Sequence, residues 1–429
     1  TPPHFKPEEY GMSSVMLDRI DSIARMGIKA GAYPGCQIVV MKEGQILYDR
    51  CFGTHAGKGS APVHSADVYD IASLSKTTGT LLALMKLYDK GRFNLSDKLS
   101  DYLPWLQGTD KKDITIREIL LHQSGLPAGI VLYPEAIDKE SYKGRLFSAR
   151  RDALHPLRLG ATTWANPNFR FLQGMTSKVR TSECSLQISD SLWLNKSFVQ
   201  VLQEKISEIP LKTKQYRYSD IGFILLRFLV DRLADMPMDE YLAKELQVSK
   251  EEILDFDLYL YNTEMPKSEI IPSANDRFLR KSVLQGFVHD ECAAFQGGVG
   301  GNAGLFSNAR EIARIYQMLL NEGELDGHRY LSRETCKLFT TEVSKISRRG
   351  LGFDKPDMKT PDKSPCTKSA PASVYGHTGF TGTCAWVDPD NELIYVFLSN
   401  RTYPDATNRK LMELDIRPRI QEVLYKAMK

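Results

Sequence analysis

The spacing of apolar and polar residues changes its period along the chain, and each period predicts a type of element. Residues 12–31 carry apolar side chains at helical spacing and end at Gly31, which predicts a first helix. Two β-rich runs, 35–42 and 45–52, flank Glu43-Gly44 and predict a hairpin. Residues 52–70 are mostly polar and predict a loop.

The next predicted helix differs from the first because it lacks a polar face. Nearly every position from Leu81 to Tyr88 is apolar, so we expect a buried helix that begins near Ser73 and stops at Gly91. Asn308 and Glu311 have the form of an N-cap and its reciprocal partner at the start of another helix, which reaches about Asn321. The remaining predicted elements are helices over 116–121, 220–235 and about 406–428, and strands over 373–379, 383–388 and 392–399.

The order of these elements predicts the domain organisation. Strands and helices occur at both ends of the chain, and the middle is expected to be mainly helical. We therefore predict an α/β (α+β) protein in which residues 1–90 and 290–429 form one discontinuous α/β domain. Residues 91–289 form a mainly helical second domain, and the tip of the helix at Ser73 lies between the two.

Composition excludes several classes of protein. With 429 residues the chain exceeds the usual size of a single core, and 42% hydrophobic residues, 25% charged residues and a net charge of +3 indicate neither a nucleic-acid binder nor a disordered chain. No run of 18 apolar residues predicts a membrane span. The first residues, Thr1-Pro2-Pro3, resemble no signal peptide, so either a signal was removed or the chain is a segment of a longer one.

Seven cysteines are scattered without a paired motif, which indicates neither a disulfide framework nor a zinc site. If the hairpin is regular, Cys36 lies opposite Cys51, but two free thiols are favoured over a disulfide because cysteine is common in cores. The run from His289 to Cys292 is assigned a structural or rim role, because consecutive side chains rarely converge on one metal ion. We expect no metal and no cofactor.

Positive charge is concentrated in one segment. Residues 129–215 lose clear periodicity, and within them 141–181 hold eight Lys or Arg against one acid, Asp152. A solvated surface is favoured over a site that attracts anionic substrates or envelope polymers. The eight basic residues are Lys143, Arg145, Arg150, Arg151, Arg158, Arg170, Lys178 and Arg180.

The first candidate chemistry lies at the start of the buried helix. Ser73 and Lys76 are three residues apart, so both lie on one helical face within hydrogen-bond reach. The free N–H groups of a helix start favour an alkoxide on Ser73 and disfavour a protonated Lys76. Taken alone, this spacing favours the simpler interpretation, an N-cap serine on a core helix.

Two further motifs follow in the order that acyl-transfer enzymes with a Ser-x-x-Lys nucleophile require. With them, the chain resembles the serine β-lactamase and penicillin-binding-protein family, and within it the branch of class C β-lactamases, D-aminopeptidases and esterases. The resemblance covers nearly the whole chain except 129–215 and implies the β-lactamase-like fold, an antiparallel sheet flanked by terminal helices. It rests on Ser73-Leu-Ser-Lys76, Tyr218-Ser-Asp220, His377-Thr-Gly379, Leu120-Leu-His-Gln-Ser-Gly-Leu126, the run from Gly304 to Arg314, and the runs Gly376 to Gly382 and Trp386 to Pro389.

The resemblance implies a role for each matching position. Ser73 is the acylated nucleophile, Lys76 is its partner amine, and Tyr218 shares the base role because nearby cations favour its deprotonation. The backbone N–H groups of Ser73 and Phe380 form the oxyanion hole. Asp220, His377, Thr378 and Gly379 bind substrate.

Two positions depart from the pattern of the family's β-lactamases. His377 stands where they usually carry Lys, and a histidine is only partly charged near neutral pH. Asp220 stands where they carry Asn, which replaces an amide with an acceptor able to hold Lys76 or a substrate amine. Both departures disfavour a true β-lactamase. His122 lies outside the three motifs and is interpreted as a histidine that anchors a turn.

The expected function is therefore that of a serine hydrolase that forms an acyl-enzyme on Ser73 and acts on D-amino-acid peptides of the cell-wall type or on small esters. A carboxylesterase of the same fold is the nearest alternative. A second alternative is a non-catalytic accessory domain of a larger envelope protein, which uses the basic segment to hold peptidoglycan or another polymer. Expected partners are a small-molecule or peptide substrate and no nucleic acid, and the expected location is the bacterial periplasm or cell envelope.

Overall fold

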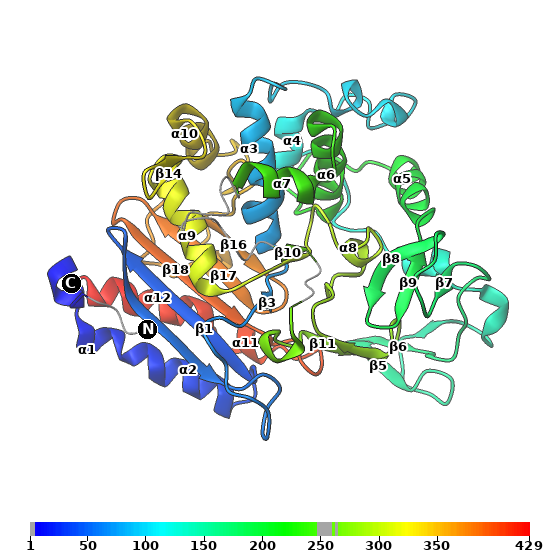
Figure 1. The fold of residues 1–429 in the computed structure, drawn as a ribbon, viewed down its shortest axis with the longest axis horizontal. Helices are drawn as coiled ribbons and strands as arrows, with labels where there is room; N and C mark the ends of the chain where they lie inside the picture. Colours follow the sequence, from blue (N-terminus) through cyan, green and yellow to red (C-terminus); the bar gives the residue numbers. More distant parts are fainter. Residues whose placement is uncertain (1–4, 247–259, 262–264) are drawn as a thin grey trace.

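A computed structural model describes residues 5–246, 260–261 and 265–429 of the protein. Its centre is a five-stranded antiparallel sheet with the order β16-β17-β18-β1-β2 (Figure 1). Residues from the two ends of the chain share this sheet because β1 pairs with β18, Cys36 lying opposite Ser399. The predicted α/β fold is confirmed. The strands are β1 (Gly35–Lys42), β2 (Gln45–Gly53), β16 (Tyr375–Gly379), β17 (Thr383–Asp388) and β18 (Leu393–Ser399).

Helices cover both faces of the sheet. Because side chains alternate along a strand, Ile38 and Val40 of β1 join one hydrophobic cluster, and Val39 and Met41 join another. The terminal helices pack on the first face and α9 packs on the second. The predicted first helix is interrupted at Asp18. The helices are α1 (Ser14–Leu17), α2 (Arg19–Lys29), α11 (Lys410–Glu413), α12 (Ile416–Ala427) and α9 (Ala309–Leu320), the last capped by Asn308 as predicted.

The hairpin of β1 and β2 forms as predicted, with Lys42 opposite Gln45, but its register changes between Val40 and Met41. This irregularity shifts the pairing by one residue, so that Cys36 lies opposite Phe52, and Cys51 lies opposite Gln37. The predicted facing of Cys36 and Cys51 is therefore wrong. A shift of one position sends the two side chains to opposite faces of the sheet. Both cysteines are free thiols, the reading that the sequence favoured.

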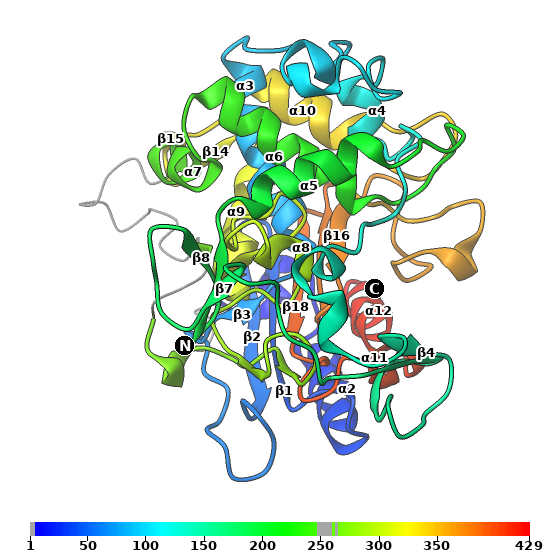
Figure 2. The same ribbon diagram turned by 90° about the vertical axis from the view of Figure 1, so that its right-hand side faces the viewer.

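A helical region packs above one end of the sheet (Figure 2). Its central member α3 buries side chains on all sides, which agrees with the apolar run from Leu81 to Leu87. In the described part of the chain, no helix is both long and apolar enough to cross a membrane. The helices are α3 (Leu81–Asp89), α4 (Ile116–Leu120), α6 (Asp220–Ala234), α7 (Met238–Leu246), α8 (Glu291–Ala294) and α10 (Arg333–Thr341).

The basic segment is built differently from the rest of the expected helical domain. Within 129–215 the structure holds two three-stranded sheets, one α-helix, α5 (Phe198–Glu208), and two short 3-10 helices, Tyr133–Ala136 and Lys139–Ser141. The strands are too short to give a clear period in the sequence. One sheet contains β4 (Phe147–Ser148), β6 (Thr163–Ala165) and β5 (Leu157–Gly160), and the other contains β7 (Thr176–Ser177), β9 (Leu192–Asn195) and β8 (Cys184–Ser189).

Short strands complete the structure and join its parts. The pairing of β13 with β3 fixes the chain just before Ser73 against the segment that precedes α9. The β11–β12 hairpin lies beside the basic segment (Figure 1). These strands are β3 (Tyr69–Asp70), β10 (Leu260–Tyr261), β13 (Leu305–Ser307), β11 (Ala274–Asp276), β12 (Ser282–Leu284), β14 (Glu324–Leu325) and β15 (His328–Arg329).

Candidate active site

Ser73 lies in a tight turn between β3 and the helix that leads into α3. The preceding residue, Ala72, has a left-handed backbone with φ of 52°, and its N–H donates to Oδ1 of Asp70 at 2.9 Å. A non-glycine residue in this conformation is strained and persists only where its surroundings hold it. The turn thus presents Ser73 at the helix start, as the sequence predicts.

The first turns of this helix are not α-helical. Lys76–Thr80 form a π-helix, which continues directly into α3. The sequence predicted a helix that begins near Ser73 but gave no sign of this π-helical segment. Threonine hydroxyls supply additional hydrogen bonds there, since Thr78 donates to the carbonyl oxygen of Leu74 at 2.6 Å and Thr80 donates to that of Gly301 at 2.7 Å. Single π turns often occur at functional sites.

Lys76 is fully buried and has three acceptors around its ammonium group. Its Nζ donates to Oγ of Ser73 at 2.8 Å and to the carbonyl oxygen of Asn302 at 2.9 Å, and it forms an ion pair of 2.8 Å with Asp220. Burial by itself lowers the pKa of Lys76, but Asp220 and Tyr218 together outweigh it and hold that pKa above its ordinary value. Lys76 is therefore an ammonium ion that positions Ser73.

Tyr218 approaches Ser73 from the helical side. Its hydroxyl lies 2.9 Å from Oγ of Ser73, and two cations lie close to its ring, with Nζ of Lys76 at 5.0 Å and Cζ of Arg349 at 4.9 Å from the ring centre. Tyr218 thus lies within hydrogen-bond reach of Ser73 and close to two positive charges.

His122 holds the segment that carries Tyr218. Its Nδ1 accepts from the N–H of Ser219 at 3.0 Å, and its ring lies 4.9 Å from that of Tyr218. Ser219 is the N-cap of α6, so this contact also fixes the start of that helix. His122 therefore positions the tyrosine through the turn, in line with the interpretation from the sequence.

His377 is buried on β16 and is uncharged. Its Nδ1 donates to the carbonyl oxygen of Thr378 at 2.6 Å, so Nε2 is free to accept from Nη1 of Arg349 at 3.2 Å. Burial, together with Arg349 and Lys76, lowers the pKa of His377 to about 3. The expectation of a partly charged histidine near neutral pH is therefore wrong, because the sequence did not reveal these cations or the burial.

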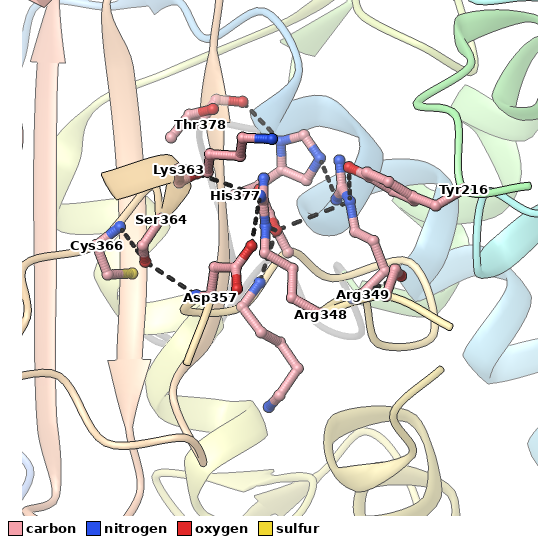
Figure 3. Close-up of polar contacts among 12 residues, drawn as sticks. Tyr216, Arg348, Arg349, Asp357, Lys363, Ser364, Cys366, His377 and Thr378 are labelled. Carbon is pink, nitrogen blue, oxygen red and sulfur yellow. Dashed lines mark hydrogen bonds and ion pairs between the residues drawn. The ribbon is translucent and has the colours of Figure 1, made fainter. Parts of the chain in front are cut away.

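The fixed positive charge behind the third motif belongs to Arg349. Its Nε donates to the hydroxyl of Tyr216 at 3.1 Å, and it lies 3.7 Å from Asp354, which Arg348 also contacts at 2.7 Å (Figure 3). Burial alone would raise the pKa of Asp354, but the two arginines outweigh it and lower the pKa to about 2. Sequence reasoning missed Arg349 because no motif contains it; the only signal was a third motif that lacked its usual cation.

The end of β16 packs against the nucleophile turn. A Cβ at Gly379 would lie 2.1 Å from Oγ1 of Thr383 and 2.8 Å from the carbonyl oxygen of Ile71. Glycine is therefore required for this close approach. Thr378 is half-buried and lines the same cleft as Ser73, whereas Gly379 contributes only its compact backbone to the packing.

Phe380 follows on the rim of the cleft. Its side chain is 56% exposed, stacks on His289 at 5.6 Å and lies under the guanidinium of Arg401 at 4.4 Å. Ser73 and Phe380 both line the cleft, which places the two residues proposed for the oxyanion hole at one site.

The cleft has a volume of about 1390 Å³ and extends from Ser73 to the basic segment. On its acidic side, Asp290 accepts from the amide of Asn302 at 2.9 Å, and the adjacent Glu291 also lines the wall. Burial raises the pKa of Glu291 to about 7. The run from His289 to Cys292 therefore forms part of the cleft wall. Within the described residues, no group of three or more His, Cys, Asp or Glu is placed to hold a metal ion.

A serine that contacts a buried lysine and a tyrosine, in a cleft between an antiparallel sheet and a helical region, defines a serine hydrolase of the β-lactamase fold. Comparison with known proteins agrees: the chain belongs to the beta-lactamase family, whose model matches residues 20–416.

Individual relatives match this chain over most of their own length. An N-acetylmuramyl-L-alanine amidase of Bacillus subtilis (strain 168) is 29% identical over 91% of this chain and 82% of its own length. A protein of Escherichia coli (strain K12), whose name gives D-alanyl-D-alanine carboxypeptidase as a proposed activity, is 27% identical over 92% and 85%. The solved structure of EstCE1, a hydrolase with promiscuous acyltransferase activity, has a TM-score of 0.62 at 15% identity, covering 96% of this chain and 98% of EstCE1.

Proposed function

We propose that the protein hydrolyses D-amino-acid peptides of the cell-wall type through an acyl-enzyme on Ser73. The observation that carries this proposal is the contact of Oγ of Ser73 with Nζ of Lys76 at 2.8 Å and with the hydroxyl of Tyr218 at 2.9 Å. A nucleophile within hydrogen-bond reach of its base and of an orienting cation is the geometry that covalent catalysis requires. The names of the two curated relatives support a substrate derived from the cell wall.

In the proposed mechanism, Tyr218 starts as the phenolate; Oγ of Ser73 attacks the substrate carbonyl, and its proton passes to the phenolate oxygen of Tyr218. Lys76 orients Ser73 as an ammonium ion, and the backbone N–H groups of Ser73 and Phe380 stabilise the oxyanion. Tyr218 returns the proton to the leaving amine as the C–N bond breaks. Water then attacks the acyl-enzyme and gives a proton to the phenolate of Tyr218, which passes it to Oγ of Ser73 as the acyl C–O bond breaks, so that the acid and free Ser73 are released.

Asp220, His377 and Thr378 complete the proposed site. Asp220 holds Lys76 through the 2.8 Å ion pair and remains one-third exposed to the cleft, where it suits a substrate amine. Thr378 offers its backbone and hydroxyl on the edge strand of the sheet. Because His377 is neutral, it offers no positive charge to bind a substrate carboxylate. Gly379 contributes by allowing β16 to pack closely against the nucleophile turn.

A carboxylesterase is the second candidate, and the uncharged His377 favours it. An ester that lacks a carboxylate beside the scissile bond needs no exposed cation at the third motif. Turnover of nitrophenyl acetate compared with that of D-alanyl peptides separates the two activities. Faster hydrolysis of the ester, with none of the peptide, would favour the esterase.

The acyl-enzyme is tested by labelling. We expect a fluorophosphonate or a fluorescent penicillin to label the wild-type protein covalently and to leave Ser73→Ala unlabelled. The variant Ser207→Ala, in α5, is the control and should label as the wild type does. Absence of label with both probes, on wild-type protein shown by circular dichroism to be folded, would contradict the proposal. A cell-envelope location is part of the same proposal and is supported by the wall-directed names of the relatives.

A further inference from the structure

The cleft wall opposite Ser73 comes from the basic segment. Arg158 of β5 pairs directly with Trp164 of β6, so their side chains share one face of that small sheet. The guanidinium carbon of Arg151 lies 5.8 Å from the ring centre of the same Trp164. All three residues line the cleft that contains Ser73. Two arginines therefore flank a half-buried tryptophan on one surface.

This surface is held by an aromatic cluster. Phe147 of β4 and Phe169 pack on Phe278 with ring centres 5.8 Å and 5.2 Å apart, and Tyr133 packs on Phe278 at 5.5 Å. Phe278 follows the strand β11, so the cluster fixes the small sheet to the β11–β12 hairpin. Arg277, the neighbour of Phe278, lines the cleft as well. The packing of these aromatic rings therefore holds this wall of the cleft in place.

The three arginines keep their charge available. Arg151, Arg158 and Arg277 are exposed, and within the described residues none of them forms an ion pair; Arg158 donates only to the carbonyl oxygen of Gly160 at 3.1 Å. Other arginines of the cleft are neutralised, since Arg280 pairs with Asp276 at 2.9 Å and Arg348 pairs with Asp354 at 2.7 Å. Free guanidinium groups bind carboxylates in a planar, paired geometry.

We propose that Arg151, Arg158 and Arg277 bind carboxylates of a peptide substrate at a distance from the bond that Ser73 attacks, with Trp164 packing against the intervening chain. The inference rests on the proposed function only for the role of Ser73. A peptide is favoured over a long polymer because the arginines line the same bounded cleft as the nucleophile. The preferred substrate is an anionic peptide, recognised by a subsite that the three motifs do not contain.

The test measures binding separately from hydrolysis. Acetyl-Glu-Glu-Glu-Glu-amide and its Gln counterpart are titrated into the Ser73→Ala protein by calorimetry at low ionic strength. We expect the Glu peptide alone to bind, and Arg151→Ala/Arg158→Ala to weaken this binding about tenfold. The matched control Lys178→Ala/Arg180→Ala removes the same charge from exposed positions of the loop between β7 and β8 and should bind as the parent does. Arg151→Ala alone should weaken binding about threefold.

We expect the Glu peptide to bind Ser73→Ala even if the protein proves not to be a peptidase. Failure of the proposed function can therefore be distinguished from failure of this inference. In the wild-type protein, the Glu peptide should also slow fluorophosphonate labelling of Ser73. Three results would overturn the inference: no binding of the Glu peptide, equal weakening in the control variant, or equally tight binding of glycerol 3-phosphate, which would mark a phosphate site.

Discussion

Nη1 of Arg349 donates to Nε2 of His377 across 3.2 Å, and the two residues lie 28 positions apart in the sequence. Burial and this contact together keep the imidazole neutral and leave the positive charge on Arg349. Burial of Arg349 opposes its charge, but Asp354 and the nearby tyrosines outweigh burial and hold its pKa above the ordinary value. The third motif therefore presents an uncharged histidine backed by a buried cation.

We expect Arg349→Gln to raise the pKa of His377, because the variant removes one of the cations that lower it. Burial, the larger cause, remains and keeps the pKa below the ordinary value. The measurement is an NMR titration of the histidine ring protons from about pH 4 to 8, with Arg150→Gln as the control. If wild-type His377 titrated near its ordinary pKa, the assignment of a neutral, buried His377 would be contradicted.

The ion pair of Lys76 and Asp220 yields a prediction about stability. Asp220→Ala leaves a fully buried ammonium without its counter-charge, so it should lower the free energy of unfolding by about 2–4 kcal/mol, a range that allows for the one-third exposure of Asp220. Lys76→Met/Asp220→Ala should recover part of this loss. Urea unfolding of the two variants and the wild type measures the difference, and equal losses in the single and double variants would refute the pairing.

Glu291 predicts a pH dependence of stability. Its pKa of about 7 in the folded state exceeds the ordinary value of 4.5, so the folded protein holds this proton more tightly than the unfolded chain. The stabilisation that this bound proton contributes is fully present below about pH 4.5 and is lost as the pH rises through 7. Because Glu291 is partly exposed, we expect a loss of about 2 kcal/mol between pH 5 and 8.

Glu291→Gln should remove that loss, and urea unfolding at several pH values measures it. Glu208→Gln, at an exposed position of α5, serves as the control and should keep the wild-type slope. The same slope in wild type and Glu291→Gln would show that other groups cause the pH dependence.

The close packing of Gly379 predicts that Gly379→Ala lowers both stability and the rate of Ser73 acylation. The added Cβ meets the backbone of Ile71, which leads into the nucleophile turn and cannot yield as a flexible side chain would. We expect a cost of about 1–3 kcal/mol, read as a lower melting temperature. Gly108→Ala, where a Cβ meets nothing within 4 Å, is the matched control.

The shifted hairpin register predicts that Cys36 and Cys51 stay reduced. All seven cysteines are free in the structure. The mass of the intact protein should therefore be the same before and after reduction, and a thiol reagent in denaturant should modify seven residues. A mass gain of about two daltons on reduction would reveal one disulfide.

Several features could be predicted from the sequence because they depend on neighbouring residues. The apolar run after Thr80 identified α3, and the polar cap at Asn308 marked the start of α9. The hairpin turn at Glu43-Gly44 was also correct, but the register failed at the irregularity between Val40 and Met41. A local shift of this kind leaves the pattern of apolar residues almost unchanged and is decided by packing on both faces of the sheet.

The position of the basic segment in the fold, by contrast, could not be predicted from the sequence. Its charge was visible in the sequence, and a solvated surface was the favoured interpretation. Only the fold brings Arg151 and Arg158 to the cleft of Ser73, through a small sheet fixed by Phe278, more than 100 residues further along the chain.

The sequence by itself determined the pair of Ser73 and Lys76, because three residues of spacing at a helix start suffice to bring them together. The tertiary structure decided their electrostatic state. Asp220 and Tyr218 outweigh burial and keep Lys76 an ammonium ion, and burial together with Arg349 keeps His377 neutral. These effects depend on burial and on distances between residues far apart in the chain, and neither quantity is written in a local pattern of residues.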